Sequence, residues 1–111
     1  MNVLPLGGKN AVNVSLQADE TDVIVNDWIW VSRQRDEGKT FTFVPYSVAA
    51  GGLMARSDSG IETVADLAGR KIGVAGGPVD KSWLLLRAYA RKNAGIDPAE
   101  VSDVKFGAPP L

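Results

Sequence analysis

The stretch KIGVAGGPVDKS, residues 71–82, decides the fold class of this chain. Its first five residues predict a strand, which the two glycines and the proline that follow bring to an end. The longest helix is expected from about Val79 to Asn93, with Trp83, Leu86 and Ala90 on one face. A strand, a glycine-rich turn and a helix in this order are typical of α/β proteins with parallel sheets.

Shorter patterns on both sides continue this alternation of strands and helices. Helices are expected where capping residues precede apolar residues at helical spacing, and strands where short apolar runs end at turn residues. The expected strands are residues 3–6, 22–25, 40–44, 53–55 and 104–106; the expected helices are residues 11–18, residues 28–35, a short helix between Thr63 and Gly69, and a helix starting at Asp97. The order predicts an α/β fold with mostly parallel sheets and flanking helices.

The composition excludes several kinds of chemistry. The 111 residues include no cysteine and no histidine, so disulfides, thiolate or imidazole zinc sites, cysteine nucleophiles and Ser-His-Asp triads are excluded within this chain. A net charge of −1 gives no whole-chain attraction to nucleic acid or to an anionic membrane. We therefore expect a binding module rather than an enzyme, with no catalytic residue, no metal site and no cofactor.

Candidate ligand-binding residues follow from the rule that open α/β sheets bind ligands beyond the carboxyl ends of their strands. Three predicted strand ends carry polar or conformationally special residues: Asn26, Asp27 and Trp28; Tyr46 and Ser47; and Gly76, Gly77, Pro78, Asp80, Lys81 and Ser82. The third group combines a glycine turn with a helix N-terminus, whose backbone N–H groups favour an anion. Lys81 and Ser82 would add donors there, and Trp28 and Tyr46 would suit a flat apolar part of a ligand.

The residues alone leave alternatives open at these places. Glycines at a strand-to-helix turn are equally explained by the tightness of the turn. The run from Gly73 to Gly77 does not fit the dinucleotide-binding pattern, and Gly8-Lys9 lacks the rest of a phosphate-binding loop. Trp28 is the better candidate for the wall of a cleft, whereas Trp30 is expected in the core.

Three segments of the chain resemble one family of transport proteins. They are ADETDVIV at residues 18–25, FVPY at residues 43–46 and, most specifically, IETVADLAGRKIGV at residues 61–74. These segments are similar to those of the substrate-binding proteins of ABC importers. The closer resemblance is to the branch that binds taurine, alkanesulfonates and thiamine precursors, the NMT1/THI5-like group.

The resemblance implies a type II periplasmic-binding-protein, or Venus-flytrap, fold, in which two α/β lobes close on a small organic solute. Residues 1–50 would be part of lobe one, residues 51–56 a hinge crossing at Gly51-Gly52, and residues 57–111 part of lobe two. The family's ligand contacts follow the same three strand ends as the candidates above. The chain would then be a fragment of a longer protein that delivers its solute to an ABC permease.

The resemblance leaves two other functions open. A branch of the same fold synthesises a pyrimidine precursor of thiamine, and that branch is thought to depend on histidine and cysteine. The chain would otherwise be a truncated remnant without a function of its own, which self-associates as a homodimer through exposed sheet edges. The family acts in the periplasm or otherwise outside the cytoplasm; this sequence shows no signal-peptide pattern, so its own compartment stays open.

Overall fold

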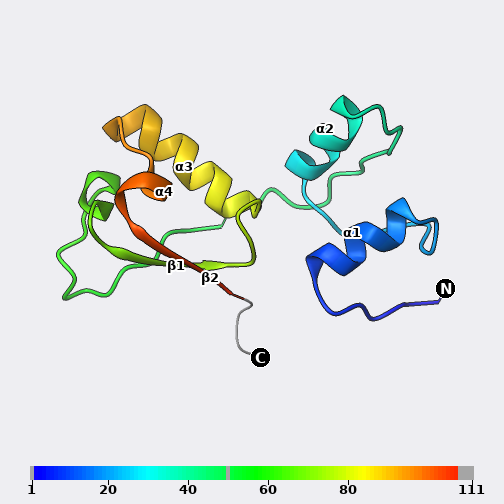
Figure 1. Ribbon diagram of the computed structural model, residues 1–111, viewed down its shortest axis with the longest axis horizontal. Coiled ribbons are helices and arrows are strands. Elements are labelled where there is room, and N and C mark those ends of the chain that lie inside the picture. Colours follow the sequence, from blue (N-terminus) through cyan, green and yellow to red (C-terminus); the bar gives the residue numbers. More distant parts are fainter. Residues whose placement is uncertain (1, 50, 108–111) are drawn as a thin grey trace. The chain divides into compact units, whose positions relative to one another are not determined.

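The computed structural model describes residues 2–49 and 51–107 (Figure 1). Met1, Ala50 and residues 108–111, which belong to the predicted lobe ranges, lie outside the described residues. The chain divides into two units, an N-terminal unit that ends at Ser47 and a C-terminal unit that begins at Val48. Among the described residues, no helix is long and apolar enough to span a membrane.

The N-terminal unit contains two helices, α1 (Lys9–Gln17) and α2 (Trp28–Asp36), close to their predicted positions. Helix α2 begins after Asp27, whose carboxylate accepts a hydrogen bond of 2.9 Å from the backbone N–H of Trp30. Side chains connect the two helices, because Lys9 forms an ion pair with Asp27 and Gln17 donates to Gln34 at 2.6 Å.

The strands predicted at residues 3–6, 22–25 and 40–44 do not form; these predictions were wrong. The segments run without a sheet partner in the described part of this unit, and Val23, Val25 and Val44 are each more than 70% exposed. A β-branched run is stable as a strand only when a neighbouring strand pairs its backbone and packs its side chains. In the described residues, these segments lack the pairing that defines a strand.

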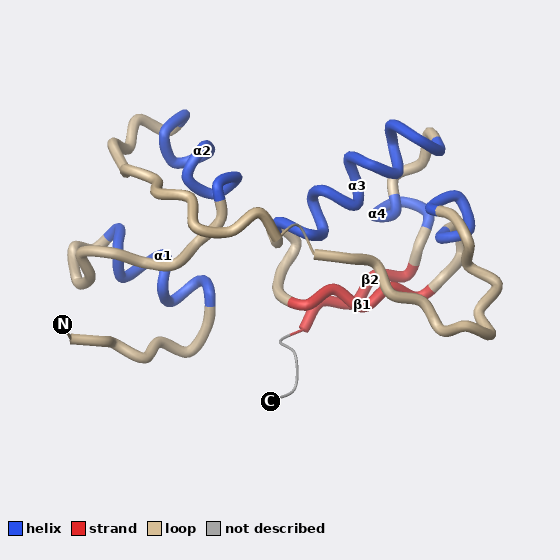
Figure 2. The backbone as a smooth tube through the Cα atoms, turned by 180° about the vertical axis from the view of Figure 1, so that it is seen from behind, coloured by secondary structure: helices blue, strands red, loops and turns tan. Residues whose placement is uncertain are grey.

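The C-terminal unit is built around two parallel strands, β1 (Lys71–Ala75) and β2 (Asp103–Gly107), with Lys71 opposite Asp103 and Ala75 opposite Gly107. Between them the chain forms helix α3 (Lys81–Ala94) and the short helix α4 (Pro98–Val101). A 3-10 helix, η1 (Val64–Leu67), precedes β1. Both helices and the strand pair are seen from behind in Figure 2. The predicted α/β class, with a parallel sheet and flanking helices, is thus confirmed.

Capping residues fix the ends of these elements. Thr63 and Asp66 form the predicted capping box of η1, and N–H donors of Thr63 and Glu62 lower the pKa of the Asp66 carboxyl. Helix α3 begins at Lys81, two residues later than predicted, because Asp80 caps it. It ends at Gly95, whose φ of 66° lies in the left-handed region that favours glycine.

The core of the C-terminal unit lies between β1 and α3. Leu67, Ile72 and Trp83 are buried together, and five partly buried side chains pack against them: Ile61, Val64, Val74, Leu86 and Val104. The Trp83 ring meets Phe106 edge to face, with centroids 5.9 Å apart. The strand predicted at residues 53–55 was wrong, because this segment runs extended without pairing and leaves Met54 on the surface.

An ion cluster centred on the buried Asp97 carboxylate holds α3 to the start of α4. Arg87 donates two hydrogen bonds to the Asp97 carboxylate, at 2.9 and 2.7 Å, and Arg91 also contacts it. Asp97 in addition caps α4 by accepting from the N–H of Ala99 at 3.0 Å. The bonds from Arg87 hold the pKa of Asp97 far below its ordinary range and raise that of Arg87.

Candidate functional site

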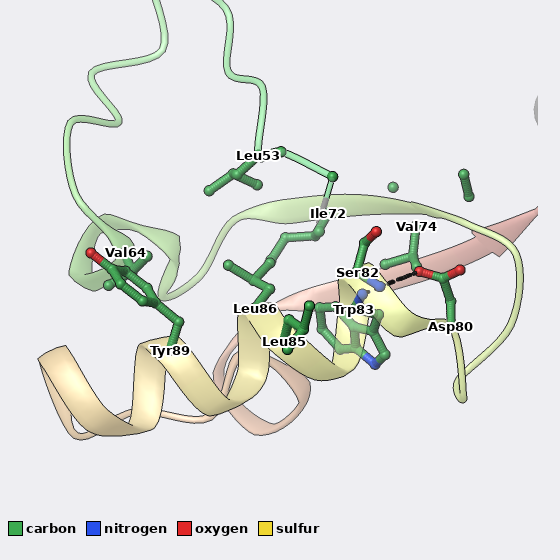
Figure 3. A pocket seen from close by; sticks show the side chains of 14 residues that line it. Leu53, Val64, Ile72, Val74, Asp80, Ser82, Trp83, Leu85, Leu86 and Tyr89 are labelled. Carbon is green, nitrogen blue, oxygen red and sulfur yellow. Dashed lines mark hydrogen bonds between the residues drawn. The ribbon is translucent and has the colours of Figure 1, made fainter. Parts of the chain in front are cut away.

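A hollow of about 610 Å³ lies in the C-terminal unit between β1 and α3 (Figure 3). Four parts of the chain form it: the extended segment at residues 51–53, Val64 of η1, strand β1 from Ile72 to Ala75, and one side of α3 with Asp80 before it. Most of the lining side chains are apolar or aromatic, and these are Leu53, Val64, Ile72, Val74, Ala75, Trp83, Leu85, Leu86 and Tyr89.

The spacing of residues on α3 and β1 explains the hollow. Ser82, Leu85, Leu86 and Tyr89 occupy positions i, i+3, i+4 and i+7, which places them on one side of the helix. Strand β1 pairs with β2 along one edge only, and in the described part of the chain no strand pairs with its other edge. The helix therefore extends past the sheet and leaves apolar side chains facing open space.

Asp80 supplies the charged end of the hollow. Its Oδ1 accepts hydrogen bonds from the backbone N–H of Ser82 at 2.9 Å and from that of Trp83 at 3.2 Å. Its Oδ2 has no hydrogen-bond partner among the described residues. Gly76, with φ of 109°, lies close by, and a Cβ at this position would be 3.5 Å from Oδ2.

Gly51 closes the hollow next to Ser82. A Cβ at this position would overlap the Ser82 hydroxyl, and the φ of 81° is one that only glycine adopts freely. The Lys81 ammonium donates to the carbonyl of Ala49 at 2.7 Å, and so helps to hold the same segment against the start of α3. Gly51 therefore allows the extended segment to pass close to the helix.

The structure gathers only some of the predicted site residues of the C-terminal unit. Asp80 and Ser82 line the hollow. Gly76, Gly77 and Pro78 form the connection between β1 and α3, outside the lining. The Lys81 ammonium, which was expected to bind an anion, donates a hydrogen bond to the carbonyl of Ala49.

The other candidates lie in the N-terminal unit. Asn26 donates to the side chain of Asn13, and Asp27 caps α2 and pairs with Lys9. Trp28, Tyr46 and Ser47 have substantial exposure to solvent, with 54% of Trp28 accessible. Trp30 stacks on Phe41 with ring centroids 5.7 Å apart.

Sequence reasoning missed the apolar part of the lining. Leu85 and Tyr89 are four residues apart, a spacing that indicates a second apolar side of the helix. This side lies next to the one that carries Trp83 and Leu86. Leu53 could not be found in this way, because its place beside α3 depends on the path of a segment without regular structure.

A second hollow, of about 540 Å³, shares Leu53, Val64 and Tyr89 with the first and extends toward Asn93 at the end of α3. Within the described residues, no group of three or more histidine, cysteine, aspartate or glutamate side chains is placed to hold a metal ion. The first hollow can therefore hold an apolar organic group against its walls and offer a carboxylate oxygen at one end.

Comparison with known sequences places this chain in a family. No curated protein matches it. The model of the family described as NMT1/THI5 like matches residues 3–110, nearly the whole sequence. With this match, and with the α/β arrangement of β1, α3 and β2, the chain belongs to the NMT1/THI5-like family.

Proposed function

We propose that this chain is the solute-binding component, or part of it, of an ABC importer. The NMT1/THI5-like family includes both solute-binding proteins and thiamine-precursor synthases. The observation that carries the proposal is the hollow between β1 and α3, which has apolar walls and polar groups at one end. Its volume of about 610 Å³ falls within the range of small-molecule sites, roughly 300–1,000 Å³.

Binding accounts for the lining better than catalysis does. The side chains around the hollow are mostly hydrocarbon, with Asp80, Ser82 and Tyr89 as the polar exceptions. The whole chain has neither histidine nor cysteine, which the synthase branch is thought to use. A general acid-base pair or a nucleophile with its activating base is not apparent in this set of residues. We therefore favour a solute-binding role over the synthase role.

In this proposal the chain is part of a longer two-lobed protein. Residues 1–50 and 57–111 would belong to lobes one and two, with residues 51–56 as the crossing between them. The exposed Val23, Val25 and Val44 support this, because apolar extended segments of this kind are stable when further strands pair with them. The complete protein would act outside the cytoplasm and pass its solute to a permease.

A thermal-shift screen tests the binding role. We expect at least one compound among sulfonates, nitrogen heterocycles and small carboxylates to stabilise the chain. At a concentration of 100 times its Kd, a ligand adds about 2.7 kcal/mol, which raises the Tm of a unit this small by roughly 10–20 °C.

Two variants locate the binding site. L53W is expected to abolish the ligand-induced rise in Tm, because the larger side chain fills the hollow. M54W is the control, because Met54 is exposed and outside the lining. A shift unchanged in L53W would contradict binding in this hollow.

Light scattering tests the consequence of the unpaired segments. We expect the isolated chain to form a homodimer or larger oligomer, because exposed β-prone segments and the open edge of β1 favour pairing between copies. The double variant V23K/V25K is expected to shift the molar mass toward the monomer. The variant N2K/N10K adds the same charge at exposed polar positions and should leave the oligomer intact. A monomeric unmodified chain would refute the prediction.

A further inference from the structure

The charge of the hollow identifies a class of solute. Among the described residues that line it, Asp80 is the one with a charged side chain, and no lysine or arginine contributes. We infer that the hollow selects an organic cation, an ammonium group attached to an apolar or aromatic body, over an anion of the same shape. This inference rests on the proposed solute-binding function and assigns the charge of the solute.

The groups that would favour an anion are already in use. Backbone N–H groups at a helix N-terminus attract anions, but those of Ser82 and Trp83 both donate to Asp80 Oδ1. The Asp80 carboxylate is therefore the anion that this helix end binds. The Lys81 ammonium is held by the Ala49 carbonyl at 2.7 Å, and its side chain is not part of the lining. A sulfonate or carboxylate entering the hollow would meet the Asp80 charge without a free cationic partner in the lining.

The groups that would favour a cation remain available. Asp80 Oδ2 accepts no hydrogen bond within the described residues, and Gly76 adds no side chain in front of it. A carboxylate that is partly shielded from water forms stronger hydrogen bonds to a charged donor than to a neutral one. The N-terminus of α3 neutralises only part of the negative charge of the Asp80 carboxylate. An ammonium group at Oδ2 would neutralise the rest.

The distribution of apolar side chains fixes where the rest of the solute lies. Asp80 and Tyr89 are about 13 Å apart along the axis of α3, at 1.5 Å per residue. Between them the walls consist of Val74, Leu85 and Leu86 (Figure 3). A solute with its ammonium at Asp80 thus places an apolar body along α3 toward Tyr89, a residue that is 58% exposed.

Isothermal titration calorimetry with three indoles of similar shape tests this assignment. The probes are tryptamine, which is cationic at pH 7, its neutral alcohol analogue tryptophol, and the anionic indole-3-acetate. We expect tryptamine to bind about 10-fold more tightly than tryptophol, since a hydrogen bond from a charged donor to a carboxylate is roughly twice as strong as one from a neutral donor. Indole-3-acetate is expected to bind more weakly than tryptophol.

Two variants separate the roles of the neighbouring charges. D80N retains a side-chain oxygen that caps α3 and removes the charge, so the preference for tryptamine over tryptophol should disappear while tryptophol still binds. K81M should change tryptamine affinity by less than about 3-fold, because its ammonium lies outside the lining. D103N, which alters an exposed carboxylate on β2, is the control and should match the unmodified chain.

The outcomes test the cation preference and the solute-binding function separately. Equal affinities for the three indoles, or tighter binding of indole-3-acetate that K81M abolishes, would overturn the cation preference and leave solute binding intact. A tryptamine preference that persists in D80N would likewise refute the role of Asp80. Failure of all three probes, together with a flat thermal-shift screen, would refute the solute-binding proposal itself.

Discussion

W83A is expected to lower the free energy of unfolding of the C-terminal unit by about 4 kcal/mol. Trp83 is 3% exposed and belongs to the buried group with Leu67 and Ile72. Replacing it removes the largest buried side chain of that group and the edge-to-face contact with Phe106. Because a small domain has a total stability of only about 5–15 kcal/mol, this loss leaves the unit close to unfolding.

Urea denaturation followed by far-ultraviolet circular dichroism measures this loss. W83F keeps an aromatic ring against Phe106 and is expected to cost less than half as much as W83A, which keeps the comparison measurable if W83A does not fold. W28A is the matched control, because Trp28 is 54% exposed and its removal should cost less than about 1 kcal/mol. Similar losses in W83A and W28A would show that Trp83 does not organise the core.

D97N is expected to lower the free energy of unfolding by about 3 kcal/mol at pH 7, at the low end for a broken buried ion pair. The Asp97 side chain is 4% exposed and accepts two hydrogen bonds from Arg87, whose own side chain is only partly exposed. Asparagine still offers an oxygen to cap α4, so the loss reports the charge interaction rather than the cap.

The same carboxylate makes stability depend on pH. The folded-state pKa of Asp97 lies below its unfolded value of about 3.9 because Arg87 donates to the charged form. The unfolded chain therefore takes up the proton first, and the contribution of Asp97 is complete at pH values well above 3.9. It is lost progressively as the pH falls below about 5 and toward the folded-state pKa.

D97N should reduce this acid sensitivity. The measurement is the decrease in the urea midpoint of unfolding from pH 7 to pH 3. D58N is a matched control, because Arg56 also donates two hydrogen bonds to Asp58, at 3.0 and 2.7 Å, but both side chains are exposed. An exposed pair of this kind contributes about 0–1 kcal/mol. Equal effects of D97N and D58N would contradict a special role for the buried cluster.

Local sequence signals predicted the elements from η1 to β2 well because they act over a few residues. The capping box of Thr63 and Asp66, the cap at Asp97 and the terminating Gly95 each depend on neighbours within one helical turn. The parallel strand at residues 71–75 likewise formed where its apolar run and the glycines after it indicated. These interactions are encoded in short stretches and need no distant partner.

Long-range pairing set the limit of prediction elsewhere. The run from Asp22 to Val25 has the composition of a buried strand, yet nothing in the run states whether another strand lies beside it. The candidate site shows the same division. Asp80 and Ser82 became candidates because they follow a predicted strand end, and both line the hollow. Leu53 reaches the hollow through the tertiary path of its segment, which no local pattern indicates.

The parallel register of β1 and β2 has a consequence for synthesis on the ribosome. Lys71 pairs with Asp103, and the partner strand of β1 is made after α3 and α4. At 5–20 residues per second, β1 waits roughly two to six seconds for β2 to be made. During that interval both edges of β1 are unpaired, and Ile72 and Trp83 lack the cover that Val104 and Phe106 later provide. We therefore expect the nascent chain to bind chaperones that recognise exposed apolar segments.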